Sequence, residues 1–204
     1  HALDHPGQPG FAIVRPPGHH AESGRAMGFC LFNSIAAAAE RALSRPGIRR
    51  VAICDFDVHH GNGTEAIFAG RRDVLFASSH QIPLYPGTGD PRQDVAANVH
   101  NASLPPGSGG NEFRDAWRRY LFEPIDQFGP DLILISAGFD AHWRDPLAQL
   151  ELKDEDYFWI GHQLRELAMT HARGRLATSL EGGYDLKALT DSTLAFAEGI
   201  TAAH

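Results

Sequence analysis

The chain has 204 residues, of which 43% are hydrophobic, and its 18 basic and 25 acidic residues give a formal net charge of −7. This length and apolar content suit one α/β domain with a sizeable core and exclude a disordered chain. The acidic balance argues against direct nucleic-acid binding, and no apolar run of about 18 residues predicts a membrane span. The two cysteines, Cys30 and Cys54, indicate reduced thiols and a cytoplasmic setting.

Short apolar runs alternate with amphipathic stretches along the chain. In chain order the expected elements are a strand at 11–14, a helix at 33–43, a strand at 51–54, a helix at 64–69, a strand at 74–77, a helix at 112–128 kinked at Pro124, a strand at 132–135, a helix at 155–172, a strand at 176–180 and a helix at 186–197. Residues 81–110 have no period and are expected to form a long functional loop. Asp90 and Asp94 in this loop are expected to be solvated, and His204 is expected at the surface. The alternation predicts a largely parallel sheet with helices on both faces.

Residue types that can do chemistry follow four of the five expected strands. They are His19 with His20, Asp57 with His59, Asp140, and Tyr184. Parallel α/β sheets bind their ligands outside the carboxyl ends of the strands. The gathering of these groups at one edge therefore predicts an active site there.

The stretch that follows the strand at 51–54 offers ligands for a metal ion. In extended backbone, residues two apart point to the same side, so Asp55, Asp57 and His59 share one side. Two carboxylates and one imidazole leave open positions on a zinc ion, which is typical of a catalytic site, and the expected ligands are Asp57, His59 and Asp140. The open positions suit a water molecule and a substrate carbonyl oxygen. The alternative is a solvated surface turn, but such turns rarely follow a fully apolar strand.

Two adjacent histidines and one tyrosine can supply the remaining catalytic groups. His19 and His20 are expected to carry the acid–base steps, because an attacking water needs a base and a leaving amine needs an acid. Asp55 and Asn62 are expected to orient the two rings through their second nitrogens. Tyr184 follows two glycines and is expected to donate a hydrogen bond to a developing oxyanion. The alternative for this tyrosine is an ordinary aromatic residue at the rim.

Six short motifs are spread over most of the chain. They occupy residues 15–20, 28–30, 55–64, 86–89, 137–142 and 181–184. Together these motifs resemble the zinc-dependent histone deacetylase family. They are most similar to class II members and to bacterial histone deacetylase-like amidohydrolases, including the acetylpolyamine amidohydrolases. The resemblance implies the three-layer arginase/deacetylase α/β fold.

The resemblance also implies roles for single residues. It implies the three zinc ligands named above, with His20 as the base beside His19 and Tyr184 polarising the substrate carbonyl. Asn62 stands where class I members have an aspartate, which supports the class II assignment.

Structural potassium ions and a substrate tunnel are further properties that the resemblance implies. The expected potassium ligands, through carboxylate and mainly carbonyl oxygens, are Asp55, Asp57, His59, Ser78 and Ser79, and part of a second set is Phe68, Arg71 and Val74. The expected tunnel residues are Gly28, Phe29, Tyr85, Leu147, Gly182 and Gly183. Tyr85 stands where phenylalanine is more usual, which favours a polar substrate stem.

These observations predict one deacetylase domain over residues 1–204, without its N-terminal part, because the family has further strands ahead of residue 11. The expected function is zinc-dependent hydrolysis of the amide of an acetylated amine, either acetyl-lysine in proteins or an acetylpolyamine. The alternative is a catalytically silent acyl-lysine binding module on the same fold, against which Tyr184 argues. A binuclear manganese ureohydrolase would need more carboxylates than the motifs supply. The expected partners are acetylated peptides or small amines, without nucleic acid or membrane, and the oligomeric state is left open.

Overall fold

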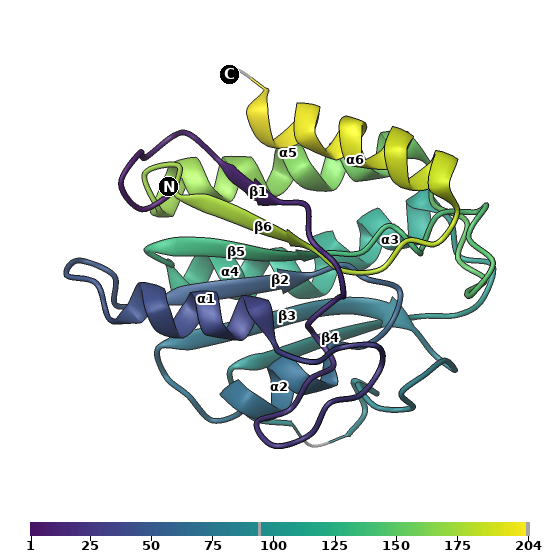
Figure 1. The fold of residues 1–204 in the computed structure, drawn as a ribbon, viewed down its shortest axis with the longest axis horizontal. Coiled ribbons are helices and arrows are strands. Elements are labelled where there is room, and N and C mark those ends of the chain that lie inside the picture. The colour runs from purple at the N-terminus through teal and green to yellow at the C-terminus, as the bar shows by residue number, and fades with distance from the viewer. Residues whose placement is uncertain (94, 203–204) are drawn as a thin grey trace.

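Parallel strands form one sheet at the centre of the molecule (Figure 1). The computed structural model describes residues 1–93 and 95–202, so the expectations for Asp94 and His204 lie outside the described residues. The strands of the described part are β1 (Gly10–Ala12), β2 (Val51–Asp55), β3 (Val74–Gln81), β4 (Val99–Leu104), β5 (Leu132–Ala137) and β6 (Leu176–Leu180). Their order is β1-β6-β5-β2-β3-β4, and every neighbouring pair is parallel. The predicted α/β class is confirmed.

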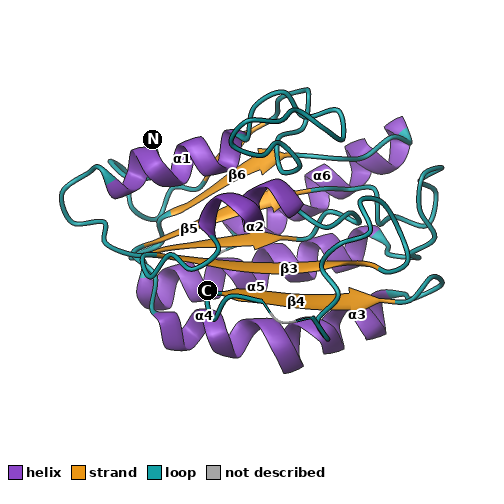
Figure 2. Cartoon of the chain, turned by 90° about the horizontal axis from the view of Figure 1, so that it is seen from below, coloured by secondary structure: helices purple, strands orange, loops and turns teal. Residues whose placement is uncertain are grey.

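Helices cover both faces of this sheet (Figure 2). The helical elements are α1 (Ser34–Leu43), α2 (Asn62–Phe68), α3 (Gly110–Ala116), the π-helical η1 (Trp117–Leu121), α4 (Phe122–Phe128), α5 (Asp154–His171) and α6 (Leu186–Thr201). Helices α1 and α2 lie on one face, α3 to α5 lie on the other, and α6 packs on α5. No helix in the described ranges is long and apolar enough to cross a membrane.

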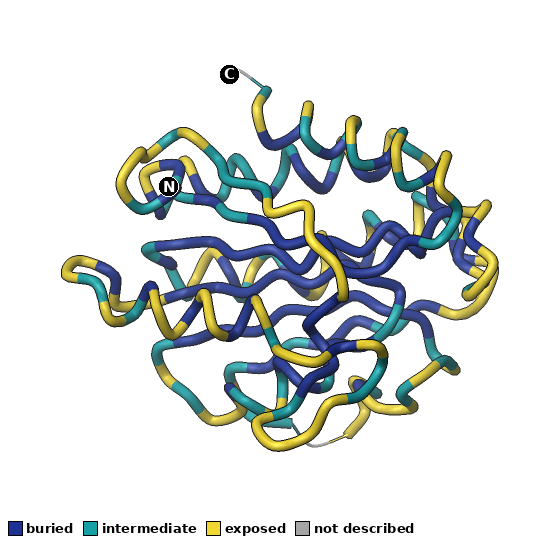
Figure 3. Tube along the Cα trace, in the orientation of Figure 1, coloured by how far each residue is buried: buried dark blue, intermediate teal, exposed yellow. Residues whose placement is uncertain are grey.

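The two faces of the sheet bury two separate sets of apolar side chains. In β2, Val51 and Ile53 pack in the cluster that includes α1, whereas Ala52 and Cys54 pack in the larger cluster that includes α5. Because successive side chains of a strand alternate between faces, a strand covered on both sides is apolar throughout. Strands β2, β3 and β5 are accordingly buried along their whole length (Figure 3). The three layers that the resemblance implies are confirmed.

Strand β4 corrects the prediction of a structureless loop over 81–110. It pairs with β3 from Phe76 opposite Val99 to Gln81 opposite Leu104. Its sequence carries polar side chains at Asn101 and Ser103, and it is the last strand of the sheet. An edge strand needs no continuous apolar run, so periodicity alone did not reveal it.

The predicted helix over 112–128 is divided into α3, η1 and α4. Within it the N–H of Phe122 donates to the carbonyl of Trp117, five residues back. The predicted kink at Pro124 has a physical counterpart here, because a proline has no N–H and its ring would collide with the carbonyl four residues earlier. The wider π turn just before Pro124 relieves that collision.

The first strand is also shorter than predicted. It ends at Ala12, and the next residue, Ile13, is 67% exposed. Pro16 and Pro17 follow closely and cannot donate to a ladder. All strands of the described part point the same way, so the loops after β1, β2, β3, β5 and β6 meet at the carboxyl edge of the sheet (Figure 2).

Candidate metal centre and active-site pocket

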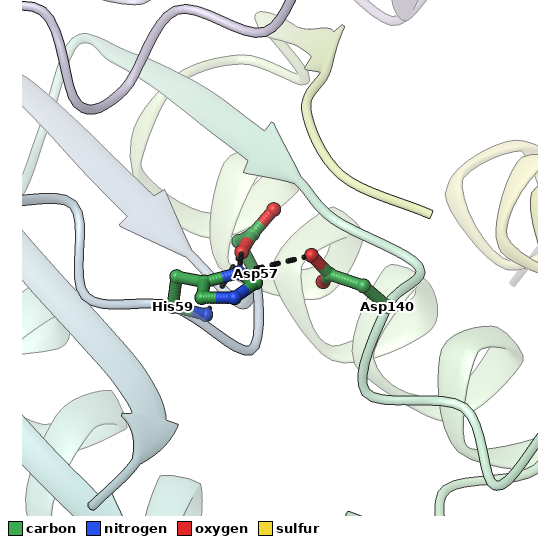
Figure 4. A group of neighbouring side chains, drawn as sticks. All are labelled: Asp57, His59 and Asp140. Atoms are coloured by element: carbon green, nitrogen blue, oxygen red, sulfur yellow. Dashed lines mark hydrogen bonds and ion pairs between the residues drawn. The ribbon is translucent and has the colours of Figure 1, made fainter. Parts of the chain in front are cut away.

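Asp57, His59 and Asp140 converge at this edge (Figure 4). Each offers one ligand atom, and these atoms all lie within 4.8 Å of one another. The Nδ1 of His59 is 3.0 Å from Oδ1 of Asp57 and 3.1 Å from Oδ2 of Asp140. Both aspartates are almost fully buried. Two buried carboxylates with one imidazole are costly without a compensating cation, so this donor set fits a zinc ion.

Backbone groups that follow two of the strands, β2 and β6, hold the two carboxylates in place. The N–H of Gly182 donates to Oδ2 of Asp57 at 2.8 Å, and the N–H of Val58 donates to Oδ1 of Asp140 at 3.0 Å. A Cβ atom on Gly182 would overlap the carboxylates of both aspartates, and one on Gly138 would overlap that of Asp57. The glycines that follow β5 and β6 are therefore required for close packing around the site.

The two adjacent histidines have different partners. The Nδ1 of His19 lies 2.9 Å from Oδ2 of Asp55, and the Nδ1 of His20 lies 2.8 Å from Oδ1 of Asn62. The amide nitrogen of Asn62 donates to Oε1 of Glu22 at 3.1 Å, which fixes the amide with its oxygen towards His20. Both rings therefore use Nδ1 as the donor. This leaves Nε2 of His20 available for chemistry, whereas Nε2 of His19 lies 3.8 Å from Oδ1 of Asp57.

These partners give the two rings opposite charge preferences in the metal-free protein. Burial disfavours the charged form of His19, but the carboxylates of Asp55 and Asp57 outweigh burial and raise the pKa to about 10. Burial and then the neighbouring charge of His19 lower the pKa of His20 to about 3. At neutral pH His20 is thus the uncharged ring, which can accept a proton.

A pocket of about 390 Å³ opens beside these residues. Its lining residues are Pro17, His19, His20, Gly28, Phe29, Asp57, His59, Leu84, Tyr85, Leu147, Gly182 and Tyr184. Burial raises the pKa of Tyr184, so its hydroxyl keeps its proton and remains a donor. The predicted tunnel residues are among the lining residues, with the exception of Gly183. The carbonyl of Gly183 instead accepts a 2.5 Å hydrogen bond from Arg15, whose guanidinium lies 5.5 Å from the ring centre of Tyr184.

The residues predicted for the first potassium site lie at the ends of β2 and β3. Asp55 is opposite Ser78 in the sheet. The Oγ of Ser78 is 2.9 Å from Nδ1 of His80, and the Oγ of Ser79 accepts a 3.0 Å hydrogen bond from Trp117. Both hydroxyls already have protein partners, so a cation there would rely mainly on carboxylate and carbonyl oxygens.

The predicted second potassium site differs from the first in that a side-chain amide donates to two of its carbonyl oxygens. The Nδ2 of Asn98 donates to the carbonyl of Phe68 at 2.8 Å and to that of Val74 at 2.9 Å. The Oδ1 of Asn98 accepts from the N–H of Gly70, which fixes the amide in this orientation. Two of the three expected carbonyl ligands therefore have a donor from the protein itself.

Glu181 is a site residue to which the sequence reasoning gave no role. It is fully buried, and its Oε2 accepts from the N–H of Gly18 at 2.6 Å and from that of His19 at 3.1 Å, while Ser136 donates to Oε1 at 3.0 Å. Burial raises the pKa of this carboxyl to about 7. The clue in the sequence was a carboxylate directly after a predicted strand, next to the glycines before Tyr184.

Comparisons with known proteins show which family the chain belongs to. The family model described as histone deacetylase domain matches residues 1–200. Histone deacetylase 10, chloroplastic, of Oryza sativa subsp. japonica is 46% identical over 187 residues, covering 90% of this chain and 42% of that protein. The histone deacetylase-like amidohydrolase of Pseudomonas aeruginosa is 42% identical over 179 residues, covering 85% of this chain and 47% of that protein.

A solved structure of a related protein has the same fold. The acetylpolyamine aminohydrolase from Burkholderia pseudomallei superposes with a TM-score of 0.89 at 33% sequence identity, covering 98% of this chain and 58% of that one. The chain belongs to the histone deacetylase family. It spans about half the length of the relatives that it matches.

Proposed function

We propose that the protein is a zinc-dependent amidohydrolase that removes an acetyl group from an amine, with acetyl-lysine or an acetylated polyamine as substrate. The observation that carries this proposal is the meeting of three ligand atoms, two oriented histidines and a protonated tyrosine around one pocket. Membership of the histone deacetylase family supports the same reading.

In this proposal Asp57, His59 and Asp140 hold the zinc ion. A bound zinc ion would polarise the substrate carbonyl and lower the pKa of a water molecule. Nε2 of His20 takes the proton of the attacking water and later gives it to the leaving amine. In the metal-free protein the carboxylates of Asp55 and Asp57 outweigh burial and keep His19 charged, and burial and that charge keep His20 neutral and able to accept a proton.

Tyr184 contributes the donor that distinguishes an enzyme from a binder. Its hydroxyl hydrogen-bonds the carbonyl oxygen more strongly as negative charge develops, so it stabilises the transition state over the ground state. Arg15 and Asp145 support this position, since Arg15 binds the carbonyl of Gly183 and Asp145 accepts from the N–H of Tyr184 at 2.7 Å. A silent acyl-lysine binding module would have no use for these supports.

The proposal includes a structural potassium ion. We propose structural potassium at the first of the two expected sites, where a buried carboxylate is available.

We propose that the protein works in a reducing compartment such as the cytoplasm, because both cysteines are buried and free.

The test is a substrate screen on the intact protein loaded with zinc. We expect release of acetate from acetyl-lysine peptides, from acetylated polyamines, or from both, with the ratio of kcat/KM values deciding the substrate class. Binding of these compounds without any release of acetate would contradict the proposal and support the binding module.

A further inference from the structure

Two buried histidines lie outside the pocket. His60 and His80 are 1% and 0% exposed, and their ring centres are 4.7 Å apart. Neither ring lines the pocket. Buried imidazoles need partners on both nitrogens, so these partners indicate what the rings do.

His60 connects α2 to the segment after β3. Its Nε2 lies 3.0 Å from Oε2 of Glu65, and its Nδ1 lies 2.8 Å from Oγ1 of Thr88. A carboxylate can only accept, so Nε2 carries the hydrogen, and the hydroxyl of Thr88 is the partner of Nδ1. Asn101 on β4 donates to the same oxygen of Glu65 at 2.8 Å, which anchors the carboxylate to the sheet.

His80 holds the next residue of the same segment. Its Nε2 lies 2.9 Å from the carbonyl oxygen of Gly89, and its Nδ1 lies 2.9 Å from Oγ of Ser78. The carbonyl can only accept, so Nε2 is the donor and the hydroxyl of Ser78 donates to Nδ1. The two histidines therefore bind consecutive residues, Thr88 and Gly89.

Gly89 lies so close to both rings that no side chain would fit at this position. Its φ is +82°, and a Cβ atom would lie 2.5 Å from Nε2 of His80 and 2.6 Å from the ring of His60. Gly87 has the same φ of +82°, but a Cβ atom there would meet nothing within 4 Å. The backbone strain at the two positions is alike, and only Gly89 touches the histidines.

The segment that the histidines hold begins at the pocket wall. Leu84 and Tyr85 line the pocket, and the N–H of Gly87 donates to the carbonyl of Leu84 at 2.9 Å, which closes the turn. The ring of Tyr85 meets that of His20 edge-on, with ring centres 5.1 Å apart and an interplanar angle of 84°. A shift at Thr88 or Gly89 therefore reaches the wall beside His20.

We propose that His60 and His80 form a clamp on residues 88–89 that positions Tyr85 and so sets the grip of the pocket on the acylated amine. This inference rests on the proposed function and assigns the clamp a positioning role, since neither ring touches the pocket. The clamp acts on substrate binding and leaves the acid–base groups in place.

The first test compares Thr88→Val with Thr88→Ser in the intact, zinc-loaded protein. Valine keeps the shape and removes the hydroxyl that binds His60, whereas serine keeps the hydroxyl. We expect valine to raise KM for an acetyl-lysine peptide by about 3- to 10-fold, the effect of one lost, partly buried hydrogen bond, with kcat nearly unchanged and with serine restoring KM. Equal KM values for the valine variant and the wild type would overturn the clamp.

The second test compares Gly89→Ala with Gly87→Ala. Both alanines meet the same backbone strain, but only the one at position 89 collides with the clamp. We expect Gly89→Ala to raise KM more than Gly87→Ala does. A clamp that only stabilises the fold would lower Tm in both variants with no difference in KM, and that result would also overturn the proposal.

Direct binding separates this inference from the proposed function. The dissociation constant of the acetyl-lysine peptide, measured by fluorescence, should rise in Thr88→Val as KM does. A wild type that binds this peptide but hydrolyses no acylated amine contradicts the proposed function, while the clamp is still judged by the dissociation constants of the variants.

Discussion

His19 and His20 are neighbours in the chain, yet their surroundings favour opposite charge states. A carboxylate binds His19, whereas an amide oxygen binds His20. An amide does not compensate a buried positive charge as a carboxylate does, so His20 is left neutral beside a charged ring. Burial and then the charge of His19 lower the pKa of His20, and the amide of Asn62 offsets them less than the carboxylates of Asp55 and Asp57 offset burial at His19. The neutral ring is therefore the one that we propose as the base.

Tyr184→Phe tests the donor role at the level of one hydroxyl. The ring remains in the pocket wall, and only the hydrogen bond to the developing oxyanion is lost. We expect kcat to fall by about 10²–10³-fold. The dissociation constant of an acetyl-lysine peptide should change little, because the metal and the pocket walls still hold the substrate. An unchanged kcat would remove Tyr184 from the mechanism.

Glu181 makes the stability of the fold depend on pH. Its native pKa of about 7 lies above the ordinary value of 4.5, so the native state holds the proton more tightly than the unfolded state. This carboxyl therefore stabilises the fold below about pH 4.5, and the contribution is lost as pH rises through about 7. The size expected from this shift is on the order of 3 kcal/mol.

Urea unfolding of the intact protein at pH 5 and pH 7 measures this effect. Glu181→Gln has no proton to lose, so the free energy of unfolding of the wild type, relative to this variant, should decrease from pH 5 to pH 7. A difference that is the same at both pH values would show that Glu181 does not titrate in this range.

At the scale of single elements, the candidate site is formed by residues that directly follow strands. The sequence predicted the positions of β2 and β5 from their apolar runs, residues 51–54 and 132–135, because the change from apolar to polar residues marks the end of each run. It failed for β4, whose polar residues resemble those of a loop. It also gave no role to Glu181, because its partners on the loop after β1 are more than 160 positions away in the chain.

Gly182→Ala tests the close packing of the β6 end against the ligands. The added Cβ would overlap the carboxylates of Asp57 and Asp140, so the ligand geometry must change. We expect zinc affinity, measured by competition with a chromophoric chelator, to weaken by about 10- to 100-fold, as for other changes around metal ligands. Gly24→Ala is the control, because a Cβ there meets nothing within 4 Å. Equal affinities of the two variants would show that the site tolerates the methyl group.

At the scale of the whole molecule, the site depends on the order of the strands. Strand β2 lies between β3 and β5, and this brings Asp57 within reach of Asp140. Apolar periodicity predicts strands and helices but does not encode their order, so the residues alone predicted one active edge without its distances. The family resemblance implied the three-layer arginase/deacetylase fold, and the structure gives the order of its strands.

The most direct test of this account is acetate release from an acetylated amine as zinc is added back to the metal-free intact protein. The three-ligand site predicts that release rises with zinc and stops rising at about one equivalent per chain. Release that keeps rising to two equivalents would indicate a binuclear centre. If the protein binds the acetylated amine but releases no acetate at any zinc concentration, the proposal that it is an amidohydrolase is contradicted.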